Sequence, residues 1–148
     1  MIGDRLPSRE LVLAACAGRV AVGHPLLAAA RGLAELYGEQ LPSSSHEMVC
    51  ERTQLARRID RWVTTKVPRP HGAAPMHSET VGMVVDRLAR CFVTAHGSLT
   101  AAVTPWDRHC AWRCLAEISL AYADLSDELN TGNRRIPEFT GATAQFAF

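Results

Sequence analysis

The chain has 148 residues, of which 47% are hydrophobic and 21% charged, and its formal net charge is +1 at pH 7. This length predicts one domain with one core, and the balanced composition excludes both a disordered acidic chain and a strongly basic nucleic-acid binder. Arg19 and His24 interrupt the longest apolar stretch. It is therefore shorter than the roughly 20 residues that cross a bilayer, and we expect neither a nucleic-acid nor a membrane partner.

The first forty residues predict two helices separated by a break. Ser8 is a suitable N-cap for a helix that runs through ELVLAACAGRVAV. Pro25 ends this pattern, because proline disfavours helical geometry at His24. The sequence PLLAAARGLAELYGEQL predicts a second helix, which begins at Pro25 and ends before the turn residues LPSSS.

The middle of the chain predicts two longer helices joined by an irregular loop. The first covers residues 46–67 and places Met48, Leu55, Ile59 and Trp62 on one apolar stripe. Residues 68–77 contain three prolines and a glycine, which is typical of a loop. Ser78 is expected to cap the second helix, which runs to about residue 97.

The clearest helix start is Thr104-Pro105-Trp106-Asp107, in which threonine caps, proline takes the first helical position and aspartate sits where a capping box places an acid. Apolar residues three and four apart continue this helix to Gly132. Residues 136–148 show no periodicity, so we interpret them as a C-terminal tail, loose or docked onto a partner. The bundle domain then covers residues 1–135, and the predicted fold is an all-α, antiparallel bundle of four to five helices.

The five cysteines are odd in number and lie within helical patterns, at Cys16, Cys50, Cys91, Cys110 and Cys114. This usage is typical of reduced thiols and favours a cytoplasmic protein. The segment LVLAAC resembles the lipid-attachment box of a bacterial lipoprotein, but the five apolar residues between Glu10 and Cys16 are fewer than the roughly 7 that a signal core needs. We therefore interpret Cys16 as a buried helical thiol.

The stretch SETVGMVVDRL, residues 78–88, concentrates charged groups in one helical segment. At 100° per residue, Glu79 and Asp86 fall on one line, away from the apolar stripe. Asp86 and Arg90 have the spacing of a surface ion pair. Gly82 costs about 1 kcal/mol relative to alanine inside a helix, which predicts close approach of another element or of a ligand.

Arg52 falls at the centre of the apolar stripe of its helix, whereas Arg57, Arg58 and Arg61 fall on the outer face. A buried guanidinium needs a carboxylate or phosphate partner, because it stays protonated and its desolvation is costly. The candidate partners are Glu39, Asp60, Glu79 and Asp86. Two hypotheses remain open: a structural ion pair, or an arginine that binds an anion or takes part in catalysis.

Other groups of polar side chains carry weaker signals. Glu117, Asp124 and Glu128 line one flank of the last helix, but the paired ExxH or ExxE spacing of di-metal sites is absent. Zinc binding by His109, Cys110 and Cys114 lacks a second cysteine pair, and no spacing places His77, His96 or His109 beside a thiol. We predict no metal site and no cofactor.

Three segments together resemble the bacterial domain-of-unknown-function 4254 family, and more narrowly its actinobacterial, mycobacterial-type branch. These segments are ERTQLARRIDRW (51–62), SETVGMVVDRL (78–88) and LAYADLSDEL (120–129). The resemblance implies candidate site positions and no reaction. The implied positions are Arg52, Asp60, Glu79, Asp86, Arg87, Asp124 and, in LYGEQL, Glu39.

The chain departs from the family pattern at several positions. Gln40 stands where the family often has the second acid of a pair, and Val81 replaces a proline. Arg57 and Arg58 replace a valine-glutamate pair, so a carboxylate that a metal-dependent mechanism would use is missing.

Two hypotheses for function follow. In the first, the charged residues form a structural network, and the protein is an interaction or assembly module that contacts a protein partner or a second copy of itself. In the second, the protein is an enzyme or small-molecule binder. Arg52 and Arg87 would then hold an anionic, phosphate-bearing group while Glu79 or Asp86 acts as general base or metal ligand.

Overall fold

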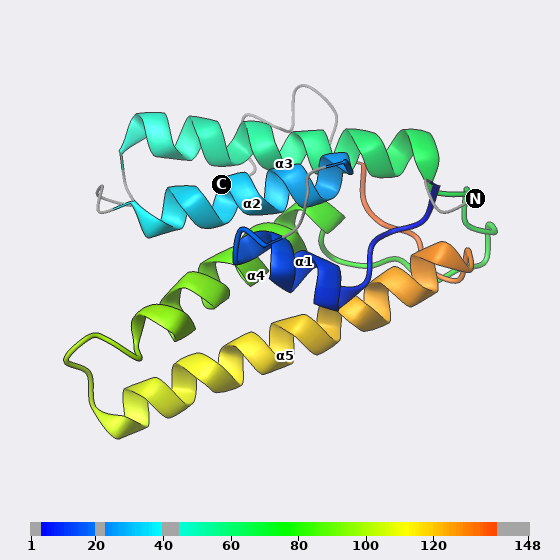
Figure 1. Cartoon of the computed structure of the whole chain (residues 1–148). Coiled ribbons are helices and arrows are strands. Elements are labelled where there is room, and N and C mark those ends of the chain that lie inside the picture. The colour runs from blue at the N-terminus through cyan, green and yellow to red at the C-terminus, as the bar shows by residue number, and fades with distance from the viewer. Residues whose placement is uncertain (1–3, 20–22, 40–44, 139–148) are drawn as a thin grey trace.

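The computed structural model describes residues 4–19, 23–39 and 45–138, and within these ranges it contains five helices and no strand (Figure 1). The helices are α1 (Arg9–Cys16), α2 (Pro25–Gly38), α3 (His46–Lys66), α4 (Val81–Gly97) and α5 (Pro105–Asn130). A single isolated bridge pairs Met76 with Arg135 in the described ranges. The predicted all-α helical fold is confirmed.

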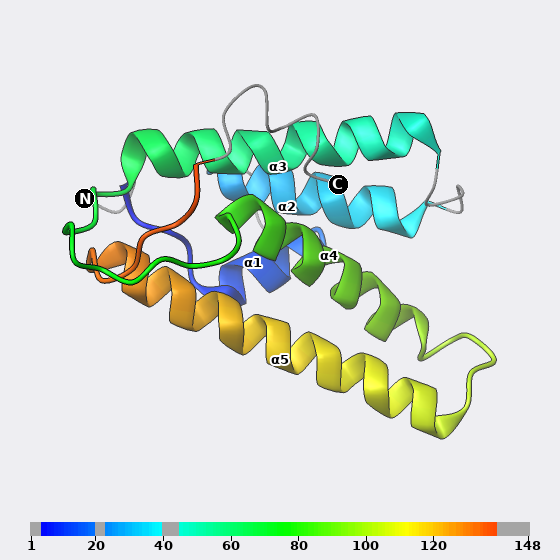
Figure 2. The same ribbon diagram turned by 180° about the vertical axis from the view of Figure 1, so that it is seen from behind.

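Helix α4 is the centre of the bundle, because it packs against each of the other four helices. Helices α2 and α3 lie side by side and run in opposite directions, and α4 lies against both (Figures 1 and 2). Helix α5 runs back along α4, on the side of α4 that faces away from α2 and α3. The short helix α1 packs mainly on α2. The turn between α4 and α5 points away from the α2–α3 pair.

The apolar stripes predicted from helical periodicity form the core. On α4, Val84, Leu88, Phe92 and Ala95 are all buried, whereas Cys91 is half-buried. The fully buried side chains of the other helices include Val12, Leu26, Leu33, Ile59 and Tyr122. Burying each large aliphatic side chain stabilises the fold by roughly 1.5–3 kcal/mol, so these stripes supply the main driving force for helix packing.

Two helix starts follow the predicted capping chemistry, and a third has a cap that was not predicted. The Ser8 hydroxyl accepts a hydrogen bond from the Leu11 amide over 3.3 Å, and the Thr104 hydroxyl accepts one from the Asp107 amide over 3.1 Å. At the predicted break before Pro25, His24 caps α2, because its Nδ1 accepts the Leu26 amide hydrogen over 3.1 Å. These bonds satisfy amides that have no partner inside their own helix.

Two predicted helix bounds are wrong. Helix α1 ends at Cys16 and not after Val22, because Gly18 takes a φ of +73°, which an α-helix does not allow. Helix α4 is capped by Thr80 and not by Ser78; the Thr80 hydroxyl accepts the Met83 amide hydrogen over 3.2 Å. Glu79 therefore precedes the helix, and the expectation that it shares a helical line with Asp86 is also wrong.

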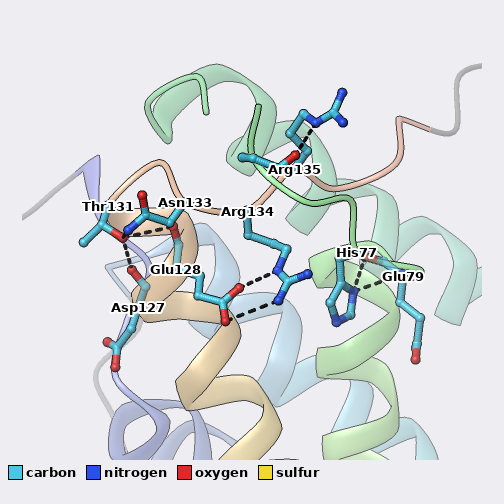
Figure 3. Close-up of polar contacts among 9 residues, drawn as sticks. His77, Glu79, Asp127, Glu128, Thr131, Asn133, Arg134 and Arg135 are labelled. Carbon is cyan, nitrogen blue, oxygen red and sulfur yellow. Dashed lines mark hydrogen bonds and ion pairs between the residues drawn. The ribbon is translucent and has the colours of Figure 1, made fainter. Parts of the chain in front are cut away.

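The segment after α5 returns to the loop that leads into α4. The Arg135 amide donates to the Pro75 carbonyl over 2.9 Å, and the His77 amide donates to the Arg135 carbonyl over 2.7 Å. Figure 3 shows Arg134 beside this crossing, where its guanidinium binds the Glu128 carboxylate. The predicted tail lies outside the described residues from residue 139 onward.

At Gly82, in the first turn of α4, helices α3 and α4 approach each other closely. A Cβ atom built on Gly82 would lie 2.4 Å from the Ala56 carbonyl oxygen and 2.9 Å from each Asp60 carboxylate oxygen. The Gly82 amide donates to Asp60 Oδ1 over 2.7 Å. The prediction of a close approach at this glycine is confirmed, and the approaching element is α3.

We predict that Gly82→Ala lowers the free energy of unfolding by about 1–3 kcal/mol, because the new methyl group pushes α3 and α4 apart and weakens the bond to Asp60. Gly97→Ala is the matched control, since Gly97 ends the same helix and has no atom within 4 Å of its built Cβ. Urea unfolding of the three proteins measures the difference. Equal stability of Gly82→Ala and the unchanged protein would contradict the close contact.

Candidate functional site

A cleft of about 680 Å³ lies between α3 and α4 and carries four arginines and three carboxylates on its walls. Its volume falls within the roughly 300–1,000 Å³ that small-molecule sites occupy. Tyr37 of α2 closes one side. The other lining residues are Val49, Arg52, Thr53, Ala56, Arg57 and Asp60 from α3, then Ser78, Glu79, Thr80, Met83, Asp86, Arg87 and Arg90 from α4 and the segment before it.

The spacing of these residues along the two helices explains why they meet in one cleft. Arg52, Ala56 and Asp60 are four residues apart on α3, so they project from one face of that helix. On α4, Gly82, Asp86 and Arg90 repeat the same spacing. Because Gly82 contacts Ala56 and Asp86 contacts Arg52, the two faces run antiparallel and lie opposite each other.

Arg52 and Asp86 form the central ion pair of the cleft. Arg52 Nη2 donates to Asp86 Oδ2 over 3.0 Å, and Arg52 Nε donates to Oδ1 over 3.4 Å. The two side chains are 28% and 20% exposed. The hydrogen bond to Asp86 raises the pKa of Arg52 above its ordinary value. Among the four partners predicted for the inward arginine, the structure therefore selects Asp86.

Tyr37 supports this ion pair from α2. Its hydroxyl donates to Asp86 Oδ1 over 2.8 Å, and the Arg52 guanidinium lies 5.0 Å from the centre of its ring. Burial raises the pKa of Tyr37, and the charge of Asp86 raises it further. The sequence predicted no role in a site for Tyr37. The signal was the phenolic hydroxyl, which needs a partner when it is buried.

Asp60 connects α3 to the start of α4. It accepts the Gly82 amide hydrogen through Oδ1, which places a carboxylate at the positive end of the α4 dipole. Burial raises the pKa of Asp60, while its hydrogen bonds with Gly82 and Thr80 act in the opposite direction. Asp60 was a candidate partner of Arg52, and the structure gives it this different partner.

Glu79 and Arg87 form a second ion pair at the mouth of the cleft, with 2.5 Å between Oε2 and Nη2. Their side chains are 25% and 54% exposed. The predicted ion pair between Asp86 and Arg90 is absent from the described residues, because Asp86 is turned toward Arg52 on the neighbouring helix.

Arg57 and Arg90 line the cleft and make no ion pair with any residue that the structure describes. Arg57 was expected on a solvated outer face together with Arg58 and Arg61. Arg57 is exposed, as expected, but it also lines the cleft, which was not expected. Arg58 and Arg61 instead lie with Trp62 around a smaller hollow between α2 and α3.

The remaining predicted site residues lie elsewhere. Glu39 follows α2 and is exposed, and Asp124 is exposed on α5; neither lines the cleft. No group of three or more metal-ligating side chains occurs among the residues that the structure describes. Two carboxylates of α5 form ion pairs: Glu117 with Arg113 of the same helix, and Glu128 with Arg134, which follows the helix.

One thiol–imidazole contact was missed in the sequence. Cys50 Sγ lies 3.6 Å from His46 Nε2 on an exposed part of the first turns of α3. The spacing of four residues was the available signal. All five cysteines lie in the described ranges and are free thiols.

The arrangement favours anion binding over acid–base chemistry at Asp86. Both oxygens of Asp86 already accept hydrogen bonds, from Tyr37 and from Arg52. These three hydrogen bonds use three of the about four lone pairs of the carboxylate, which leaves at most one for a substrate proton. Arg57 and Arg90 offer free guanidinium donors, which match the geometry of phosphate and carboxylate groups.

We predict a coupling energy of about 1–2 kcal/mol between Arg52 and Asp86 in a double-mutant cycle of the two alanine variants, because the pair is partly buried and shares two hydrogen bonds. The pair of Arg113 and Glu117 is the matched control, since these side chains are 69% and 65% exposed. Exposed pairs couple by about 0.5 kcal/mol or less. Equal coupling in both pairs, measured by urea unfolding, would show that the cleft pair is an ordinary surface contact.

Comparison with known proteins yields one match. The model of a family described as "Protein of unknown function (DUF4254)" matches residues 47–137, which is more than half of the chain. This range contains every lining residue of the cleft except Tyr37. No curated protein and no solved structure matches the chain. None of the described helices is both long enough and apolar enough to cross a membrane.

Proposed function

Since the chain belongs to the DUF4254 family of proteins of unknown function, we propose its function from the cleft: it binds a small, phosphate-bearing molecule between α3 and α4. The observation that carries this proposal is the presence of Arg57 and Arg90 without carboxylate partners in the described residues. A guanidinium keeps its charge at physiological pH and forms two parallel hydrogen bonds to a phosphate group.

The paired residues have supporting roles in this proposal. Asp86 and Tyr37 hold Arg52 in place, so its position does not change when a ligand enters. Arg87 is paired through Nη2 and is half-exposed, which leaves its other donors available to an anion. The acid–base role considered for Glu79 and Asp86 has less support, because each carboxylate already binds an arginine.

We also propose a cellular location and a branch of the family for this protein. We place the protein in the cytoplasm, which its five free thiols support. We place it in the actinobacterial branch of the family, which the three segments at residues 51–62, 78–88 and 120–129 support through their resemblance.

We predict that inorganic pyrophosphate raises the melting temperature of the protein, because a ligand that binds the folded state alone stabilises it by about 2.7 kcal/mol at a concentration of 100 times its Kd. Arg57→Ala and Arg90→Ala should each reduce this shift. Arg113→Ala is the control, since Arg113 is an exposed arginine on α5, away from the cleft. The proposal falls if pyrophosphate and nucleotides leave the melting temperature unchanged, or if all three variants respond alike.

A second candidate function is protein–protein contact at the turn between α4 and α5. Leu99, Val103 and Trp106 gather there with 57%, 37% and 70% of their surface exposed. An exposed tryptophan among aliphatic side chains is typical of interface hot spots. If the partner is a second copy, sedimentation should show a dimer that Trp106→Ser dissociates; a monomer at all concentrations would contradict self-association.

A further inference from the structure

Arg57 and Arg90, which make no ion pair with any residue in the described ranges, lie at different positions along the cleft. Helices α3 and α4 run antiparallel with Ala56 opposite Gly82 and Arg52 opposite Asp86, so Arg90 lies opposite the start of α3, near Val49. At 1.5 Å per residue, the backbone positions of Arg57 and Val49 are about 12 Å apart along the axis. Arg57 and Arg90 therefore belong to opposite ends of the cleft.

The middle of the cleft does not favour an anion. Arg52 and Asp86 lie between the two ends and neutralise each other, and a phosphate placed there would meet the negative charge of Asp86. Val49, Ala56 and Met83 contribute uncharged, mostly carbon surface to the walls. Each end therefore has one arginine without an ion pair in the described residues, and the two ends are separated by a neutral surface. At the Arg57 end, the carboxylates of Glu79 and Asp60 are held by Arg87 and by the Gly82 amide.

The two ends differ in what surrounds the arginine that has no ion pair in the described residues. Arg87 extends back to Glu79, beside the first turn of α4, and thus lies on the side of Arg57. At the other end, Arg90 lies near Tyr37. The positive charge of Arg90 acts to lower the pKa of the phenol, while burial acts to raise it. The Arg52 guanidinium lies over the same ring. An anion at one end would meet Arg57 and the outward donors of Arg87, and an anion at the other end would meet Arg90.

We infer that the ligand is a bisphosphorylated small molecule whose two charged groups are held at opposite ends of the cleft, with an uncharged body across Val49, Ala56 and Met83. This inference rests on the proposed function, because it assumes that the cleft binds anions. It goes further by specifying two anionic groups roughly 8–12 Å apart, the spacing that follows from the helical rise. A single phosphate or a pyrophosphate is too short to reach both ends, so each such ion binds at one end or at the other.

Isothermal titration calorimetry with a series of α,ω-alkane bisphosphonates tests the spacing directly. The chain length is varied from about one to about ten methylenes, and each compound is compared with the alkyl monophosphonate of equal length, which controls for contacts of the hydrocarbon. We expect the ratio of the two affinities to peak near six to eight methylenes. At the peak, the bisphosphonate should bind at least about 10-fold more tightly, because the second group binds within an already formed complex.

Variants of the two arginines provide the second measurement. Arg57→Ala and Arg90→Ala should each reduce the affinity for the best bisphosphonate to about that of its monophosphonate, whereas Arg113→Ala should not. Both cleft arginines lie outside the core, and thermal melts without ligand establish that each variant is folded. The inference is wrong if the ratio of bisphosphonate to monophosphonate affinity does not depend on chain length while monophosphonates still bind at Arg57 or Arg90. In that case the proposed function still stands. Absence of binding by every compound overturns both.

Discussion

The contact between α3 and the first turn of α4 is the constraint on which the site depends. Gly82 has no side chain, so the Ala56 carbonyl and the Asp60 carboxylate occupy the space that a methyl group would need. The hydrogen bond from the Gly82 amide to Asp60 then joins the two helices at one point. Because both helices are rigid, this contact determines which residues face each other further along the cleft.

Because this contact fixes which residues of α3 and α4 face each other, some charged side chains of the cleft are paired and others are not. Asp86 lies opposite Arg52, four residues beyond the Gly82 contact on each helix, and Tyr37 completes its hydrogen bonding. Leaving Arg52 unpaired in this partly buried position would be costly, so the pair is needed for stability whatever the cleft binds. Arg57 and Arg90 are more exposed, and they can remain unpaired at little cost until an anion arrives.

Sequence periodicity predicted the helices, their core stripes and the inward position of Arg52, because these depend on the 3.6-residue repeat of a single helix. It also identified Gly82 as a contact point, since a mid-helix glycine lowers stability unless packing compensates. The true start of α4 was missed: both Ser78 and Thr80 are good caps, and the choice depends on Asp60 from another helix.

The composition of the site was harder to predict than the fold. The role of Tyr37 depends on the packing of α2 against α4, and the position of Arg57 depends on the width of the cleft. Neither property is encoded within one helix. Glu39 and Asp124 lie outside the cleft for the same reason: helical spacing and a matching motif identify a position in the chain but not its neighbours in space.

The central claim is that Arg52 is held by Asp86 while Arg57 and Arg90 are available to anions. Side-chain NMR of the arginine Nε–H groups during a titration with inorganic phosphate tests it most directly. We expect slow hydrogen exchange and an unchanged signal for Arg52, with fast exchange and progressive shifts for Arg57 and Arg90. Fast exchange at Arg52, or shifts that begin there and spare the other two, would contradict it.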